Sequence, residues 1–169
     1  MTAVGQVKHA VAAAIKAAGC AAIESYSEEQ LKRYATAVAA VGTKETVIEE
    51  SGAIEYLGEK VDEATQETVS VYGRKVLLTL LIEVYAPRTL GAAGCEEAAE
   101  TITQAMMTAL PEGLKLGSLQ WGKADWDKTT GMFRLDASAK YAAYFVAEAA
   151  EDETVFTDFV LKGTVKERE

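Results

Sequence analysis

The sequence predicts an α+β fold, in which an antiparallel or mixed β-sheet with an extended hairpin is packed by two helices on one face. Two Ala-rich segments carry apolar residues at helical spacing, one at the N-terminus and one after residue 94. Segments in which apolar and polar residues alternate lie between these helices and after them. Because the chain contains no internal repeat and no linker, we expect a single domain over residues 1–169.

The first helix is predicted over residues 2–18. Its bulky apolar residues fall at helical spacing: Val4, Val7, Val11 and Ile15. Gly19 follows the last of them and is expected to end the helix. Since the apolar stripe is narrow, this helix has to dock on another element.

Strands are predicted over the middle of the chain. The alternation through residues 34–40 and the pair Val47-Ile48 indicate two strands, joined by a tight turn at Gly42-Thr43. Residues 51–68 are rich in Glu and Gly, which is typical of a solvated loop or an irregular hairpin arm.

Residues 69–85 give the strongest strand signal, broken only by Gly73-Arg74-Lys75. One face of this strand is apolar throughout: Val76, Leu78, Leu80, Ile82 and Val84. Leu77 and Leu81 make the other face apolar as well, so we expect the strand in the middle of a sheet covered on both sides. Pro87 ends it.

The second helix is predicted over residues 95–110, after a flexible Gly-rich stretch. Glu96, Glu97 and Glu100 would occupy its first turns, where the helix dipole favours negative charge. Its buried stripe is expected to comprise Ala98, Ile102, Ala105, Met106 and Ala109.

The last third of the sequence has a β pattern. A strand over residues 116–125 leads through a polar turn at 127–131 into a strand at 132–148, with a final strand at 155–165. In the long strand one face is apolar: Phe133, Leu135, Ala137, Ala139, Tyr141, Ala143 and Phe145. Arg134, Asp136, Ser138 and Lys140 oppose them, so one side of this antiparallel strand is expected to face water.

Composition excludes several classes of function. The chain has 26 acidic and 17 basic residues and a net charge of −9, which argues against binding nucleic acid through its phosphates. His9 is the single histidine, so zinc sites and His-based catalysis would lack a member. Cys20 and Cys95 have no CxxC context and are expected to be free thiols in a reducing compartment. No catalytic, cofactor-binding or metal-binding residues are predicted, and no cofactor.

The sequence predicts neither membrane insertion nor export. No apolar run approaches the ~20 residues of a membrane span. A basic region followed by an apolar core and a cleavage site is missing from residues 1–16.

Asp125 and Asp127 flank Trp126 and admit two interpretations. Two carboxylates two residues apart on a strand share a face, which is the geometry of a weak cation site or an acid/base pair. Asp before a Thr-Thr-Gly turn also accepts local backbone hydrogen bonds, and this interpretation is the simpler one.

Aromatic residues in the last third suggest an interface. Trp121 and Trp126 are five residues apart in a predicted strand, which places them on opposite faces, one in the core and one free to contact a partner. Tyr141, Tyr144 and Phe145 raise the same choice between core packing and interface at the end of the long strand.

The arrangement of these segments resembles the tail-terminator and tail-completion proteins of long-tailed bacteriophages and prophages. The resemblance covers nearly the whole chain: the N-terminal helix, the β arm, Val71-Tyr72-Gly73-Arg74-Lys75-Val76 leading into a strand that ends in Val84-Tyr85-Ala86-Pro87, and the Ala/Glu-rich helix. In the second half, residues 116–122, Asp125-Trp126-Asp127 and Gly131-Met132-Phe133-Arg134-Leu135 are similar to the hairpin of that family.

The resemblance implies a non-enzymatic structural protein of the virion, made in the cytoplasm of a bacterial host and placed in the tail or at the head-tail junction. Such proteins form a homo-oligomeric ring, commonly a hexamer, that caps the tail tube and joins it to the head. Tail-tube and head-completion proteins would be the partners. The candidate interface residues are Tyr56, Leu57, Tyr72, Trp126 and Tyr144. We also hypothesise that the acidic chain lets DNA pass through the ring without binding it.

Two alternatives stay open. One is a tail-tube or head-tail connector protein, which also uses a sheet with a flanking helix and oligomerises. The other, from a different class, is a small acidic ligand- or metal-binding domain, or an enzyme that uses carboxylates such as Asp125 and Asp127.

Overall fold

A computed structural model of the chain describes residues 3–49 and 56–148. Its elements, in chain order, are α1 (Ala3–Ala17), β1 (Ala21–Ile23), α2 (Glu28–Leu31), β2 (Val38–Glu49), β3 (Tyr56–Val61), β4 (Thr68–Ala86), α3 (Gly91–Thr108), β5 (Lys115–Trp121), β6 (Asp125–Asp127) and β7 (Met132–Glu148). The strands form one sheet in the order β1-β2-β4-β7-β5, with β3 beside β4 and β6 beside β7. Only the β1-β2 pair is parallel among these described pairs, so the predicted α+β fold is confirmed, and of the two predicted kinds of sheet, antiparallel or mixed, the mixed one is present.

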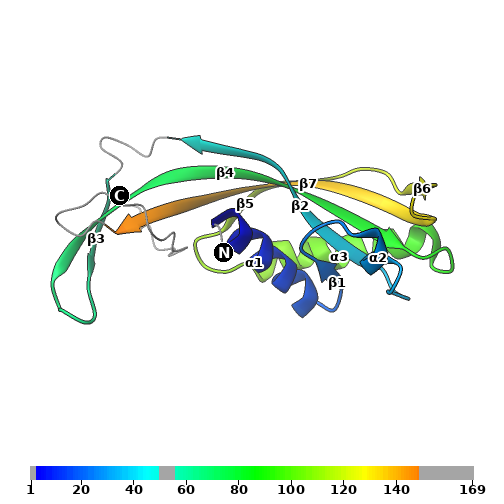
Figure 1. Cartoon of the computed structure of the whole chain (residues 1–169), viewed down its shortest axis with the longest axis horizontal. Coiled ribbons are helices and arrows are strands. Elements are labelled where there is room, and N and C mark those ends of the chain that lie inside the picture. The colour runs from blue at the N-terminus through cyan, green and yellow to red at the C-terminus, as the bar shows by residue number, and fades with distance from the viewer. Residues whose placement is uncertain (1–2, 50–55, 149–169) are drawn as a thin grey trace.

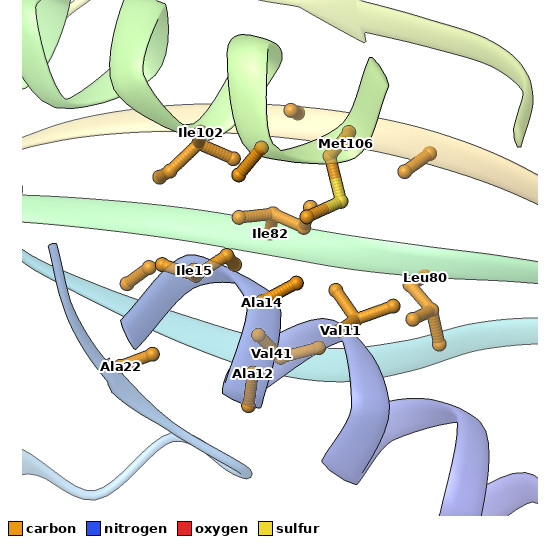
Figure 2. Packing of buried hydrophobic residues seen from close by; sticks show 14 of the residues in the cluster. Val11, Ala12, Ala14, Ile15, Ala22, Val41, Leu80, Ile82, Ile102 and Met106 are labelled. Carbon is orange, nitrogen blue, oxygen red and sulfur yellow. The ribbon is translucent and has the colours of Figure 1, made fainter. Parts of the chain in front are cut away.

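Helices α1 and α3 lie on one face of the sheet, as predicted (Figure 1). Val11 and Ile15 of α1 and Ile102 of α3 meet Ile82 in a single core (Figure 2). The apolar face of β4 is buried throughout this core, because every second side chain of the strand points toward the helices. Gly19 follows α1 with φ +93°, a left-handed conformation that glycine adopts without strain, so the predicted glycine stop is confirmed.

A smaller apolar cluster lies on the opposite face of the sheet. Its buried members are Ile23, Leu31, Val38, Ala40, Tyr85 and Met132. Leu31 comes from the short helix α2, which is capped by the hydroxyl of Ser27 and was not predicted from the polar sequence around it. Among the described residues, the expected cover on both faces of the sheet exists at this end, and Leu77 and Leu81 farther along are half-buried.

Residues 38–49 form one strand, so the prediction of two strands joined by a turn at Gly42-Thr43 is wrong. β2 pairs with β4 from Val38 to Glu49, and its register shifts between Thr43 and Glu45. A β-bulge accommodates an extra residue without reversing the chain. Gly42 and the polar residues after it therefore mark a bulge within the strand and not a turn between two strands.

Helix α3 begins earlier than predicted, at Gly91. The Gly-rich stretch is therefore helical, and Gly91 has φ +67° at the point where the chain enters the helix. The three glutamates consequently lie beyond the first turn, which contains no acidic residue. Ala109 is exposed and follows the helix, whereas the other four residues of the predicted stripe are buried.

Two strands extend beyond the helices. β4 is a single strand of 19 residues, uninterrupted at Gly73-Arg74-Lys75, and β7 has 17 residues. With β3 and the end of β2 they form a projecting arm, here defined as residues 45–49, 56–75 and 144–148 (Figure 1). β3 and β4 make a hairpin, as one of the two interpretations of residues 51–68 predicted, although 51–55 lie outside the described residues.

Two further predictions concern the C-terminal segment and membrane insertion. The last predicted strand, at 155–165, lies outside the described residues. Of the helices that the structure describes, none combines the length and apolar character that crossing a membrane requires.

Candidate functional site

Four of the five candidate interface residues lie in the projecting arm: Tyr56, Leu57, Tyr72 and Tyr144. Trp126 does not join them, because β6 and β3 lie at opposite ends of the molecule (Figure 1). The structure therefore divides the predicted interface into an arm and a distant aromatic residue.

Tyr56 and Tyr72 stiffen the hairpin of the arm. They are cross-strand partners, and their rings meet edge to face with centroids 5.8 Å apart and an interplanar angle of 67°. Such aromatic pairs contribute about 0.5–1.5 kcal/mol beyond their buried area. Leu57 stands at the register shift between Tyr56 and Gly58 and is half-buried. The pair leaves Tyr56 exposed enough to contact a partner as well.

The tip of β2 is open on several sides. Val47 and Ile48 point to opposite faces of the sheet, yet their exposed fractions are 41% and 58%. Both faces of the sheet therefore present a large, exposed apolar residue here. The sequence predicts Val47 and Ile48 as strand residues but not as interface residues. The feature that could have indicated an interface is the length of the strand, because a helix of 15 residues such as α1 is too short to cover its far end.

The outer edge of β2 has no strand partner beyond Ala40 among the described residues. β1 pairs with β2 only at Val38, Ala39 and Ala40. Within residues 3–49 and 56–148, segment 45–49 of β2 therefore pairs with β4 on one side and has no strand partner on the other, which leaves an edge that another strand can extend.

The outer edge of β7 ends its pairing in the same way. β5 reaches only as far as Ala142 of β7, and β6 covers residues 132–134. Within the part of the chain that the structure describes, segment 143–148 pairs with β4 alone. Tyr144 is half-buried there and pairs with Lys75, whose ammonium lies 3.5 Å from Glu49.

The two tryptophans lie on the same face, so the prediction of opposite faces is wrong. Trp121 pairs with Ala137 and Trp126 with Phe133, and both partners belong to the helix-side face of β7. The reason is that residues 122–124 separate two strands, which breaks the alternation assumed across them. Trp121 donates its indole N–H to Thr103 Oγ1 at 2.9 Å.

Trp126 is exposed and stands at the end of the sheet far from the arm. Its ring meets Phe133 edge to face at 5.2 Å, and the Arg88 guanidinium lies 6.0 Å from its centroid. Tyr141, by contrast, is buried in the core with its hydroxyl on Met106 Sδ at 3.0 Å. The side chain of Phe145 lies outside the described residues.

Asp127 serves the turn, which supports the simpler of its two interpretations. Its carboxylate accepts hydrogen bonds from the Thr129 amide at 3.0 Å and from the Thr130 hydroxyl at 2.8 Å. These bonds, the Thr130 bond above all, lower the pKa of Asp127. Asp125 accepts from the amide of Trp126 at 2.8 Å. Both carboxylates also line an open hollow of about 380 Å³ with Arg134 and Asp136.

An ionic network centred on Arg134 occupies the sheet face opposite the helices. Arg134 donates to both oxygens of Asp136, at 2.6 and 2.8 Å, and lies 2.7 Å from Glu83 on the neighbouring strand β4. The Tyr85 hydroxyl donates to Glu83 at 3.2 Å. Burial of Tyr85 raises the pKa of its phenol. Sequence reasoning placed Arg134 and Asp136 on a wet face without predicting this network, because Glu83 comes from a distant part of the chain.

The histidine and the two cysteines are either paired within the chain or buried. His9 Nδ1 lies 2.7 Å from a carboxylate oxygen of Glu24. Cys20 and Cys95 are free thiols, as predicted, and both are buried. Burial raises the pKa of the Cys95 thiol to about 11. Among residues 3–49 and 56–148, no group of three or more His, Cys, Asp and Glu side chains is arranged to hold a metal ion.

No family model and no curated protein matches the chain. A solved structure described as "Virion of native gene transfer agent (GTA) particle" contains a chain that is 18% identical, with a TM-score of 0.42, over 85% of this chain and 99% of that one.

Proposed function

We propose that this protein is a non-enzymatic structural component of a phage or prophage virion, which forms a ring that caps the tail tube and joins the tail to the head. The resemblance of the sequence to tail terminators suggests this function. The projecting arm is the structural observation that supports it. The proposal treats residues 1–169 as one domain whose working surface is an interface between subunits.

A ring needs two different surfaces on each subunit, because its contacts are head to tail. The arm offers two such surfaces on opposite edges of one sheet, segment 45–49 of β2 and segment 143–148 of β7. It also holds exposed apolar side chains: Val47, Ile48, Tyr56 and Val61. Exposed apolar strands with an open edge are characteristic of surfaces that another chain covers.

The tail-tube and connector alternative uses the same surfaces, since tube proteins also form rings. It differs in that tube rings stack without limit. The alternative from another class rests on the hollow that Asp125 and Asp127 share with Arg134 and Asp136. Against it, Asp125, Asp127 and Asp136 already accept hydrogen bonds from within the chain.

The mass of the purified protein in solution, measured by sedimentation velocity over a concentration series up to millimolar, separates these functions. We expect a finite ring, near six subunits, that stays the same size once formed. Growth without limit would favour the tube protein. A monomer that binds a divalent cation or a metabolite, with loss of binding in Asp125→Asn, would favour the ligand-binding domain.

Passage of DNA through the ring is part of the proposal. The net charge of −9 supports it, because a negative wall repels phosphates. An assembled structure with an electropositive lumen would contradict it.

A further inference from the structure

Two edges of the arm, segments 45–49 and 143–148, each lack a second strand partner among the described residues, and they lie on opposite sides of the same sheet. β4 lies between them, with β2 on one side and β7 on the other. We infer that segment 45–49 of one copy pairs with segment 143–148 of the next copy, so that the sheet continues from subunit to subunit. This inference rests on the proposed ring and specifies its contact.

A second copy of this chain is the occupant that fits the β2 tip. Val47 and Ile48 expose apolar side chains on both faces, beside a backbone edge that no other described strand pairs with, so we expect the partner to be a strand that extends the sheet. The chain itself carries such a strand edge, at 143–148 of β7. The bulge between Thr43 and Glu45 interrupts regular pairing before this point, which leaves 45–49 as the regular part of the edge.

The direction of pairing follows from the topology. β2 and β7 are each antiparallel to β4, so they run in the same direction. Rotation about a ring axis from which the strands are tilted by well under 90° keeps that direction from copy to copy. The contact between β2 and the β7 of the next copy is therefore a parallel pair.

The offset between the edges is compatible with closure. Segment 45–49 lies opposite residues 75–79 of β4, and segment 143–148 lies opposite residues 71–76. Their centres differ by between three and four residues, about 12 Å along the strand. Three strands per copy are about 14 Å wide, so aligning the edges needs a strand tilt of about 40°, which is within the range of closed barrels.

The directions of the side chains predict that Val47 of one copy and Tyr144 of the next copy meet across the contact. Val47 pairs with Leu77, and Leu77 pairs with Ala142, so Val47 and Ala142 share the face opposite the helices. Tyr144 is two residues from Ala142 on the same strand and lies on that face too. Ile48 points to the other face and serves as a matched control.

Disulfide formation between two variants tests the contact. Val47→Cys and Tyr144→Cys are purified separately, mixed under reducing conditions that allow subunit exchange, and then oxidised. Within one chain these positions are two strands apart, about 10 Å, which exceeds the span of a disulfide. A covalent dimer should therefore form only between copies.

We expect a covalent dimer in the mixture of Val47→Cys with Tyr144→Cys, and a ladder of covalent oligomers from the double variant. The parent chain, each single variant alone, and Ile48→Cys mixed with Tyr144→Cys should give none, since Cys20 and Cys95 are buried. A dimer from Val47→Cys alone would mean that β2 pairs with β2, which overturns the inference.

The same samples are analysed by sedimentation before oxidation, so the two proposals fail separately. A finite ring without a covalent dimer in the mixture would overturn the edge pairing and leave the ring intact. A monomer at all concentrations, again without a covalent dimer, would overturn both.

Discussion

Arg134 holds Asp136 through two parallel hydrogen bonds, although the two residues are only two positions apart on β7. Neighbours at this spacing point to the same face of a strand, which brings the guanidinium fork within reach of the carboxylate. The Asp136 bonds raise the pKa of Arg134, which stays charged, and the same guanidinium reaches Glu83 on β4. One side chain thereby joins the two central long strands on the face that the long helices leave open.

Replacing Arg134 with methionine should destabilise the protein by about 1–3 kcal/mol, because Glu83 loses its ionic partner. The Glu83 side chain is only 13% exposed, so water does not fully replace the guanidinium. Urea unfolding followed by circular dichroism measures the change. Arg134→Lys should recover part of the loss only, since an ammonium cannot form both parallel bonds.

Arg33→Met is the matched control. Arg33 pairs with Glu29 one helical turn away, and both side chains are largely exposed. Exposed pairs of this kind contribute about 0.3–0.5 kcal/mol. Equal losses from Arg33→Met and Arg134→Met would show that the network on the sheet face has no special weight.

The Cys95 thiol should resist modification in the folded protein. It belongs to α3, is fully buried between that helix and the sheet, and lies 3.4 Å from the carbonyl oxygen of Phe133. We expect dithionitrobenzoate at pH 8 to react with Cys95 only as fast as the protein opens, because the thiolate is the reactive form. Met107→Cys, at a position 75% exposed on the same helix, should react at once and calibrates the assay.

Cys95 also gives the stability a dependence on alkaline pH. Its pKa is raised from 9.0 to about 11 in the folded chain, so the folded state holds the proton more tightly than the unfolded state. This stabilisation is complete below pH 9 and declines as the pH rises toward 11. The difference in unfolding free energy between the parent and Cys95→Ala should therefore shrink from pH 8 to pH 10.5. A constant difference would contradict the assignment.

The sequence predicts the long elements well because each repeats one simple period many times. β4 and β7 each place an apolar residue at every second position over a long stretch, and α1 holds four apolar residues on one side, so local exceptions do not obscure them. Two of the errors fall where a glycine is compatible with both a loop and a regular element. Gly42 stands beside a bulge within β2, and Gly91 with Gly94 begins α3, although both places resemble loops.

The candidate site is less predictable from the sequence, since it depends on where the helices and the neighbouring strands β1 and β5 end relative to the longer strands β2 and β7. That Val47 and Ile48 are strand residues follows from their type, but their exposure follows from how far β2 extends past the helices. The free edges likewise depend on where β1 and β5 stop pairing. The network of Arg134 joins residues about 50 positions apart, a separation that alternation within one strand does not address.

Gly94→Ala should destabilise the protein in spite of the better helix propensity of alanine. A Cβ at Gly94 would lie 2.6 Å from Leu90 Cβ and 3.4 Å from Ala86 Cβ. Leu90 Cβ cannot rotate away, so the start of α3 has to shift, at a cost of about 1–3 kcal/mol. Alanine returns about 1 kcal/mol of propensity. Thermal unfolding should show a lower midpoint, whereas Gly117→Ala, with its nearest atom at 3.5 Å, should change it little.

Val47→Lys should reduce the mass of the assembled protein without unfolding the subunit. Val47 is 41% exposed in the isolated chain, so a lysine there reaches water and costs the folded monomer little. In a ring the same position faces a neighbouring strand, and a charge buried in that contact without a partner opposes it. Met107→Lys is the control, because it makes the same change of charge at an exposed apolar residue on α3, away from the arm. Sedimentation velocity should therefore show smaller particles for Val47→Lys and unchanged ones for Met107→Lys, with equal midpoints of urea unfolding for both.

Two outcomes would contradict this prediction. Unchanged particles from Val47→Lys would exclude the β2 tip from the subunit contact. An equal decrease in particle mass for both variants would attribute the effect to net charge, since each variant adds a single positive charge to the acidic chain.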